Sequence, residues 1–205
     1  MPITRGFKGK QSNADVKHDR IPPGQYVTQD FPVLTAGPTQ RTPVENWSLT
    51  IQRGGKLLAS WNWAEFEALH QTDRTTDIHC VTKWTKFDTR WRGVTIDDLI
   101  KAAGLSVPPT QFVMAHCDGG YTTNLPVADM LNGKAMIATR YDNLPIPATH
   151  GGPARLLVPH LYFWKSAKWV RRLEFIDTNT PGFWESMGYH IYGDPWREQR
   201  YTGDA

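Results

Sequence analysis

The chain has 205 residues, of which 40% are hydrophobic, so it can bury a substantial core, and one large domain is favoured over two small ones. The formal net charge of +3 is mild and Lys and Arg form no long run, which argues against a nucleic-acid-binding protein. No run approaches the roughly eighteen apolar residues that a membrane helix needs, so we expect no membrane insertion.

The two cysteines, Cys80 and Cys117, are too few for a disulfide framework, although a single bridge between them stays open. Their scarcity fits a reducing compartment. The N-terminus is polar, without the apolar region of a signal peptide and without a twin arginine. We therefore expect a cytoplasmic protein.

The first half of the chain predicts short strands and a short helix. Residues 1–24 are basic, polar and rich in Gly and Pro, and we expect them to wrap the surface of a single domain formed by residues 25–205. The stretch QYVTQDFPVLTAG predicts an early strand, which Pro32 interrupts. Residues 46–63 predict a hairpin with a Gly-Gly turn, and residues 62–71 a helix that Asn62 caps.

The second half continues the same alternation. Residues 75–84 predict a strand with Cys80 near its carboxyl end, and residues 94–105 predict the clearest helix, capped by Thr95 and closed by Gly104. Further strands are predicted over 111–126, 136–143, 154–164 and 168–178, and a short helix over 126–133. Short strands between short helices, without βαβ spacing or a Gly-rich phosphate loop, predict a mixed α+β fold.

Cys80 has several interpretations from its residue type alone. Most intracellular cysteines are small buried hydrophobic side chains. A cysteine nucleophile needs a base, and the adjacent His79 would point to the opposite face of a strand. Zinc needs three or four ligands, but the chain has no Cys-x-x-Cys or His-x-x-x-His pair. A metal that arrives in its own sulfur-rich cofactor needs only one protein thiolate.

A second group of interest is the stretch HGGPARLLVPHLYFWKSAKW, residues 150–169. It places His150, Arg155, Lys165 and Lys168 among glycines and an apolar run. It is either an exposed turn with ordinary basic residues or an anion site. The second interpretation rests on the planar fork of Arg, the point charge of Lys and the close backbone approach that glycine allows.

Taken in order, these segments resemble the molybdopterin-binding domain of the sulfite oxidase family. DIHCVTKW resembles the strand end whose cysteine binds molybdenum, and RYDNLPIPATHGGPARLLVPH with FWKSAKW resembles the pterin-binding motifs. YVTQDFPV, GYTTNLP and PGFWESMGYHIYG resemble an early strand, a later turn and the closing segment. The resemblance covers roughly residues 20–196. It implies a sulfite-oxidase-type mixed α+β fold with short strands and helices, a Mo-molybdopterin cofactor and a bacterial type of enzyme.

The resemblance also implies residue roles. Cys80 would bind molybdenum together with the pterin dithiolene, and Tyr189 falls at the position of an active-site tyrosine. The implied cofactor-binding residues are Thr28, Asp30, His79, Cys80, Tyr121, Asn124, His150, Arg155, Lys165, Ser166 and Lys168.

Two departures bear on the substrate. Thr28 stands where sulfite oxidases hold a sulfite-binding arginine, and the family's Arg-Arg continuation after the cysteine is replaced by Val81-Thr82-Lys83-Trp84. The Cys-Val-x-x-Trp pattern is closer to bacterial molybdoenzymes that reduce sulfoxides. We expect oxygen-atom transfer on a small substrate, with sulfite a poor candidate and a sulfoxide a better one. No haem motif or iron–sulfur cysteine set is present, so a separate electron-transfer partner is expected.

Two alternatives stay open from the sequence. The first is a molybdopterin-binding carrier or sensor without turnover, which the missing substrate arginines favour. The second is a cofactor-free globular domain in which Cys80 is part of the core.

Overall fold

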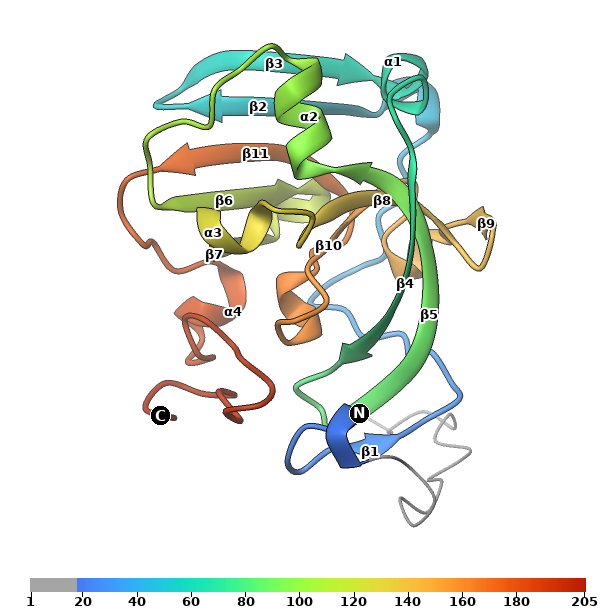
Figure 1. Ribbon diagram of the computed structural model, residues 1–205, viewed down its shortest axis with the longest axis vertical. Helices are drawn as coiled ribbons and strands as arrows, with labels where there is room; N and C mark the ends of the chain where they lie inside the picture. The colour runs from blue at the N-terminus through green and yellow to red at the C-terminus, as the bar shows by residue number, and fades with distance from the viewer. Residues whose placement is uncertain (1–17) are drawn as a thin grey trace.

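The computed structural model describes residues 18–205, so positions 1–17 of the predicted surface segment lie outside the described residues. Within that range the chain forms two sheets (Figure 1). Sheet A contains β1 (Tyr26–Val27), β4 (Thr72–His79), β5 (Trp84–Thr95), β8 (Met136–Tyr141), β9 (Leu144–Pro145) and β10 (Arg155–Leu157). Sheet B has the order β3 (Lys56–Asn62), β2 (Ser48–Arg53), β11 (Val170–Ile176), β6 (Phe112–Cys117) and β7 (Thr122–Pro126).

The helices are few and short: α1 (Trp63–Glu67), α2 (Ile96–Ala102), α3 (Val127–Met130) and α4 (Phe183–Ser186). Two of them confirm the predicted caps. Asn62 accepts a hydrogen bond from the Glu65 amide at 3.0 Å, and its own amide donates to the Glu65 carboxylate at 2.8 Å. Thr95 Oγ1 accepts from the Asp98 amide at 3.0 Å, and the chain leaves α2 through Gly104 with φ +63°. Both caps provide a hydrogen-bond acceptor for a backbone amide in the first turn, where the helix itself supplies none.

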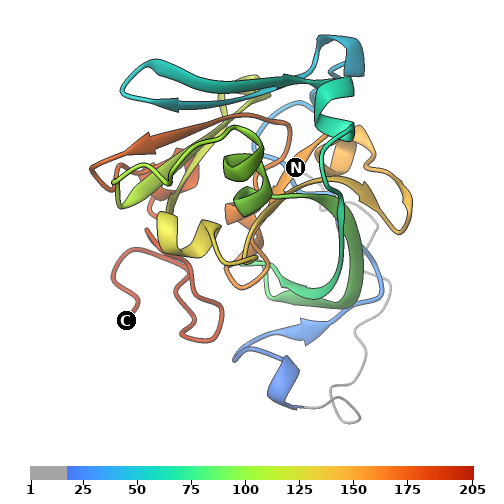
Figure 2. The ribbon, with the colours of Figure 1, turned by 45° about the horizontal axis from the view of Figure 1, so that its top comes forward.

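The predicted hairpin is confirmed as β2 and β3, joined at Gly54-Gly55, where both glycines have positive φ. The long strand β5 was not predicted. It curves around one side of the molecule with β4 beside it (Figure 2). Burial does not alternate regularly along β5, because the strand pairs with β1, β4 and β8 and changes surroundings on the way. The period-2 signal of a half-buried strand is therefore weak.

Two other predicted strands are shorter than expected. The early strand is only β1, which pairs in parallel with the start of β5. The strand predicted over 154–164 ends at Leu157 and is followed by a 3-10 helix over Phe163–Lys165. Pro159 has no amide to donate, and the Val158 amide instead donates to Ser166 Oγ at 2.9 Å. The mixed α+β class is confirmed.

One hydrophobic core joins the two sheets, with Leu49, Ile51 and Leu173 from sheet B and Val94 and Ile137 from sheet A. The two sheets therefore pack against each other through this shared core. A second cluster, rich in aromatic residues, lies against sheet A and includes Trp84, Trp91, Tyr162, Phe163 and Trp164. It carries one wall of the site described below.

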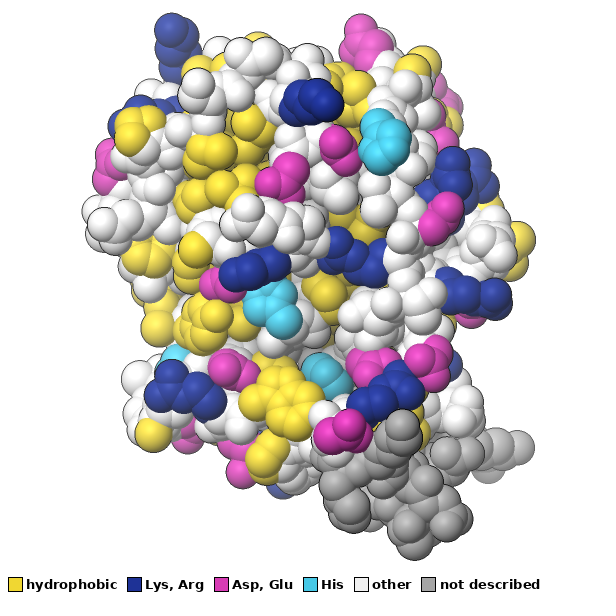
Figure 3. Space-filling view, viewed as in Figure 1, with side chains coloured by type: hydrophobic (Ala, Val, Ile, Leu, Met, Phe, Trp, Pro, Cys, Tyr) yellow, Lys and Arg dark blue, Asp and Glu magenta, His cyan; other side chains and the backbone are white. Residues whose placement is uncertain are grey.

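The described end of the N-terminal segment is held on the surface by ion pairs. Arg20 contacts Asp77 at 2.6 Å and Asp88 at 2.7 Å, which ties the segment to β4 and β5. On the face shown in Figure 3, basic and acidic side chains alternate without a continuous basic stripe. No helix within residues 18–205 has the length and apolar character needed to cross a membrane.

Candidate active site

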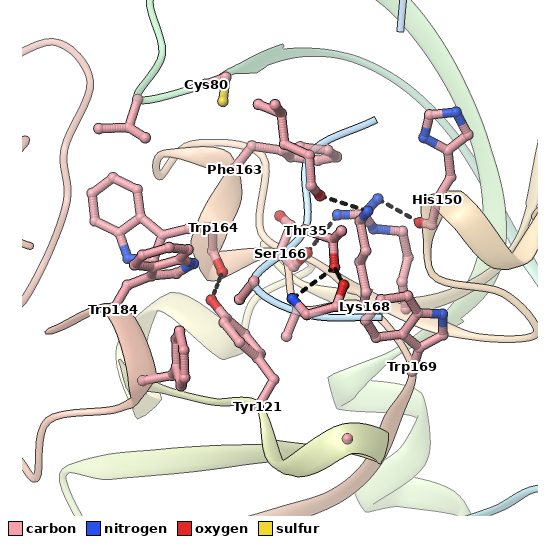
Figure 4. Close-up of a pocket in the computed structure, with 18 of the residues that line it drawn as sticks. Thr35, Cys80, Tyr121, His150, Phe163, Trp164, Ser166, Lys168, Trp169 and Trp184 are labelled. Atoms are coloured by element: carbon pink, nitrogen blue, oxygen red, sulfur yellow. Dashed lines mark hydrogen bonds between the residues drawn. The ribbon is translucent and has the colours of Figure 1, made fainter. Parts of the chain in front are cut away.

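A cavity of about 350 Å³ opens beside sheet A, and we call it the site cavity. Its lining comes from five stretches that are distant in sequence: 31–40, 80–84, 118–121, 150–169 and 183–189. Cys80 projects into it from the β4–β5 turn, with His150 and Lys168 on one side and Trp164 and Trp184 on the other (Figure 4). Concave sites of this kind are where small molecules and cofactors bind.

A tight turn fixes the position of the Cys80 thiol. The Cys80 amide donates to the Trp84 carbonyl at 2.9 Å, and the Lys83 amide donates to the Cys80 carbonyl at 3.0 Å. Thr82 Oγ1 donates a hydrogen bond to the Cys80 sulfur at 3.1 Å. Burial raises the pKa of the Cys80 thiol, and the Thr82 contacts and the Arg200 charge offset this only in part. The thiol therefore keeps its proton near neutral pH, and a bound metal ion would displace that proton.

A cationic cluster, formed by Arg155 and Lys168 with the neutral His150 beside them, lies across the cavity from Trp164 and Trp184. Arg155 donates to the His150 carbonyl at 2.7 Å and to the Ser166 carbonyl at 2.5 Å. Lys168 Nζ donates to the Thr149 carbonyl at 2.6 Å and to the Leu34 carbonyl at 2.7 Å. None of the three forms an ion pair with any residue in the described range. The cluster therefore concentrates positive charge without a protein anion.

The pKa values of this cluster reflect its unbalanced charge. Burial lowers the pKa of Arg155 to about 9, and burial together with the Arg155 charge lowers that of Lys168 to about 7. Burial and the same two cations lower the pKa of His150 to about 4. Arg155 Nε and His150 Nδ1 are buried and have no hydrogen-bond partner among residues 18–205. An anion with several acceptor oxygens would satisfy these groups.

The opposite wall is aromatic. Tyr189 packs edge-on against Trp164 at 5.2 Å between ring centroids, and its ring lies 4.9 Å from that of Trp184. Tyr121 supports this wall from below, because its hydroxyl donates to the Trp164 carbonyl at 2.8 Å. Burial raises the pKa of Tyr189, so its hydroxyl stays protonated and can donate a hydrogen bond.

Seven of the predicted site residues line the cavity: Cys80, Tyr121, His150, Arg155, Ser166, Lys168 and Tyr189. Asn124 and Lys165, which the resemblance placed on the pterin, do not line it. Lys165 Nζ lies 2.6 Å from Glu185 Oε1 and donates to Asn124 Oδ1 at 3.0 Å, in a fully buried network. These two residues connect β7 to α4 instead of facing the cavity.

Thr28, Asp30 and His79 are also absent from the lining. Thr28 Oγ1 accepts from the Asp30 amide at 3.1 Å, which shapes the turn after β1. His79 Nδ1 lies 3.0 Å from Thr85 Oγ1, and burial lowers the pKa of this histidine to about 4. The structure thus turns His79 away from the cavity that Cys80 faces, as the strand argument predicted.

Residues 31–40 also line the cavity, although no pattern in the sequence predicts it. Phe31 stacks on the His150 ring at 4.0 Å between centroids, and eight residues of this stretch line the cavity. The Pro and Gly residues of the stretch signal a loop, but nothing in it signals a site. Cys117 is buried in the core at the end of β6, and both cysteines are free, so the disulfide alternative is excluded.

The donor set fits a metal that brings ligands of its own. Residues 18–205 contain no group of three or more His, Cys, Asp or Glu side chains able to hold a metal ion. One thiol faces a cavity whose other side carries an unpaired cationic cluster. This arrangement suits a phosphate-bearing cofactor that supplies the remaining metal ligands. The site therefore fits a phosphate-bearing cofactor that brings most of its own metal ligands.

Comparison with known proteins agrees. The sequence pattern of the family described as "Oxidoreductase molybdopterin binding domain" matches residues 36–184. The chain is 39% identical to the Bacillus subtilis protein named "Uncharacterized oxidoreductase YuiH". The match covers 97% of this chain and 100% of that protein. The chain belongs to the sulfite oxidase family of molybdopterin-binding domains, and it is a molybdopterin-dependent oxidoreductase with Mo-molybdopterin as cofactor.

More distant relatives are longer. The Burkholderia mallei protein-methionine-sulfoxide reductase catalytic subunit MsrP is 27% identical over 73% of this chain and 38% of its own length. The sulfane dehydrogenase SoxCD from Paracoccus pantotrophus has the same fold, with a TM-score of 0.59 and 20% identity over 68% of this chain and 40% of that chain. This chain thus spans less than half of either protein.

Proposed function

We propose that this protein reduces a small uncharged sulfoxide to the thioether. The balanced reaction takes one sulfoxide, two protons and two electrons, and gives one thioether and one water. The observation that carries the proposal is the distribution of charge in the site cavity. Within the described lining, Arg155 and Lys168 are the cationic side chains, and both belong to one cluster.

The cationic cluster is suited to the phosphate of the cofactor, which leaves the rest of the lining without positive charge. Lys83 and Arg90, which could replace the missing sulfite-binding arginine, do not line the cavity, and neither does Thr28. Each charge-assisted hydrogen bond that sulfite would lack is worth about 1.5–3 kcal/mol. Sulfite binding is therefore disfavoured by roughly 10- to 150-fold for each missing contact.

The aromatic wall suits a neutral sulfur compound. Sulfur makes favourable contacts with aromatic rings, and Trp164, Trp184 and Tyr189 present such rings beside Cys80. A protonated Tyr189 hydroxyl can donate to the sulfoxide oxygen and favour its departure as water. The name of the Burkholderia relative, a methionine-sulfoxide reductase, supports the same substrate class.

The chain's own residues have distinct tasks. Cys80 would hold the metal, and the cationic cluster would hold and orient the pterin through its phosphate. Bound Mo-molybdopterin supplies the two-electron oxygen-transfer chemistry, and the protein supplies binding, orientation and exclusion of water. The electrons would come from a separate carrier protein. We also propose the cytoplasm as the compartment, which the free thiols of Cys80 and Cys117 support and cell fractionation would test.

The test uses protein purified from a host that makes the cofactor. We expect about one molybdenum per chain, turnover of dimethyl and methionine sulfoxides with a reduced dye, and sulfite oxidation at least tenfold less efficient in kcat/KM. Robust sulfite oxidation with weak sulfoxide reduction would reverse the substrate assignment. Molybdenum without turnover of any sulfoxide, N-oxide or sulfite would favour the carrier or sensor alternative.

A further inference from the structure

The C-terminal segment 198–204 contacts two sides of the site cavity, although it lies beyond the residues that match the family pattern. Arg200 Nη1 donates to the carbonyl of Val81, the residue after Cys80, at 2.6 Å. The backbone of the same segment pairs with the Tyr189 region: Tyr201 forms a bridge with Tyr189, and the His190 amide donates to the Arg200 carbonyl at 3.1 Å.

The Cys80 turn is thereby held from outside by side chains. The Gln25 side chain donates from Nε2 to the Cys80 carbonyl at 3.1 Å, next to the hydrogen bond from Arg200 to the Val81 carbonyl. Arg200 Nη2 reaches the Pro23 carbonyl at 3.4 Å, and its guanidinium lies 4.9 Å from the Tyr162 ring centroid. One guanidinium fork therefore links the turn to the N-terminal segment and to the aromatic cluster.

Burial of this arginine needs an explanation. Arg200 is 7% exposed, and its ion-pair partner in the described range, Glu198, is 3.7 Å away on a half-exposed side chain. Burying a guanidinium is unfavourable unless its N–H groups form hydrogen bonds. An apolar side chain at this position would hold the segment against the core without that desolvation penalty. The hydrogen bond from Arg200 Nη1 to the Val81 carbonyl satisfies one donor of this buried guanidinium, and Val81 is the residue that follows Cys80.

We propose that Arg200 is a positioning residue that fixes the Cys80 turn and couples it to Tyr189 through the C-terminal segment. The metal ligand and the hydrogen-bonding hydroxyl would then keep a constant separation. The positive charge close to Cys80 would also favour the negative charge of a metal-bound thiolate. This inference rests on the proposed role of Cys80 as the ligand.

The test compares Arg200→Met, Arg200→Lys and the parent. Arg74→Gln is the matched control, because Arg74 also donates to two backbone carbonyls but lies outside the cavity lining. In the apoprotein, we expect Arg200→Met to speed hydrogen exchange of the Cys80, Lys83 and Tyr189 amides at least tenfold, with β2 and β11 unchanged. In the loaded protein, it should shift the thiolate-to-molybdenum absorption band and lower the molybdenum midpoint potential.

Arg200→Lys keeps the positive charge and N–H donors on a single nitrogen, so it should restore most of the hydrogen-exchange protection, the absorption band and the midpoint potential. Arg74→Gln should change none of these. Unchanged exchange in the Cys80 turn, or an unchanged band and potential, would overturn the proposal and leave Arg200 a structural residue. If Arg200→Met does not fold, Asp204→Ala decides the coupling. Asp204 accepts from the Arg200 amide at 2.7 Å, so its loss should speed exchange at Cys80 and Lys83, and no change there would overturn the coupling.

These outcomes are distinct from a failure of the proposed function. A protein that never retains molybdenum would defeat the proposed function, whereas hydrogen exchange is measured on the apoprotein and tests the coupling by itself.

Discussion

Arg155 and Lys168 show how single residues in this protein are tuned for an anion. Arg155 is buried and Lys168 is half-buried, both donate to backbone carbonyls, and neither meets a carboxylate in the described range. Burial, and after it repulsion from the Arg155 charge, lowers the pKa of Lys168 to about 7. Such an arrangement is unfavourable in the free protein and becomes favourable once an anionic group binds.

Replacing Lys168 with Met should therefore weaken cofactor retention more than folding. One charge-assisted contact is worth about 1.5–3 kcal/mol, which corresponds to a loss of affinity of roughly 10- to 150-fold. Pterin content and the thermal midpoint of the apoprotein are measured together. Lys56→Met, at an exposed position of β3, is the control and should change neither. Equal pterin in the Lys168 variant and the parent would remove Lys168 from the cofactor site.

The affinity for sulfate, a divalent anion that does not titrate near neutral pH and here probes this cluster, should fall as pH rises through about 7. In the free protein Lys168 is half protonated near that pH, and the anion binds the protonated form. Calorimetry at pH 7.5 in two buffers of different ionisation enthalpy should show proton uptake on binding, and Lys168→Met should abolish it. Between pH 7 and 10.5, Lys168 is protonated in the unfolded chain but largely neutral in the folded chain. The free energy of unfolding of the apoprotein therefore rises with pH over this range as far as Lys168 contributes to it. Proton-neutral binding in the parent contradicts this assignment.

Cys80→Ser and Cys117→Ser form an internal comparison. If Cys80 is the ligand, serine in its place loses the thiolate-to-molybdenum absorption and the turnover, because a hydroxyl is a poor substitute for a soft thiolate. Pterin can remain bound through the cationic cluster. Cys117→Ser should keep the spectrum and turnover and lose only about 1–2 kcal/mol of stability. A Cys80→Ser protein with its spectrum intact would mean that another group binds the metal.

At the scale of elements, the connection between β7, the 3-10 helix over Phe163–Lys165 and α4 sets the aromatic wall. Lys165 and Glu185 form its centre, and Glu185 Oε1 also accepts from Trp164 Nε1 at 3.0 Å and from Thr123 Oγ1 at 2.9 Å. A carboxylate from the helix that carries Trp184 thus fixes the other tryptophan of the wall.

Removing one partner of this pair should be strongly destabilising. Lys165→Met leaves the Glu185 charge buried without its cation, and we expect a loss of about 3–5 kcal/mol. Lys165→Met combined with Glu185→Leu should lose less, because no buried charge remains. Urea unfolding of the parent, of Lys165→Met, of Glu185→Leu and of the double variant measures this difference. A double variant as unstable as the sum of the two single variants would show that the two side chains act independently.

Elements were predictable to the extent that their signals are local. The Asn62–Glu65 cap and the Gly54-Gly55 turn depend on neighbouring residues, and both are confirmed. β5 escaped prediction because its residues face different partners along its length. The turn at Cys80 depends on Lys83, which has φ +75°. A lysine rarely adopts this left-handed conformation, so the sequence does not predict the turn.

At the scale of the whole molecule, the buried His79 and the half-buried His116, His150 and His190 link stability to pH. Burial lowers the pKa of His79 and His150 to about 4 and also lowers those of His116 and His190. Between pH 6.5 and 4 the unfolded chain binds protons that the folded chain does not. The stability of the apoprotein should therefore fall as pH falls through this window, by at most about 3 kcal/mol for each fully shifted group.

Thermal midpoints of the apoprotein at pH 7, 5.5 and 4.5 measure this effect. His79→Gln should reduce the fall, and His70→Gln, at an exposed side chain, should leave it unchanged. A midpoint that stays constant down to pH 4.5 would contradict the burial of these histidines as neutral side chains.

The sequence by itself determined the fold class, the family and seven of the residues that line the cavity, because these follow from short motifs in a set order around Cys80, His150 and Arg155. Only the tertiary structure decided which candidates share a cavity. Asn124 and Lys165 carry the expected residue types, yet the packing of β7, the 3-10 helix over Phe163–Lys165 and α4 places both in a buried network with Glu185. Arg200 carries no motif, and its contact with Val81 spans 119 residues, so only chain folding brings the two together.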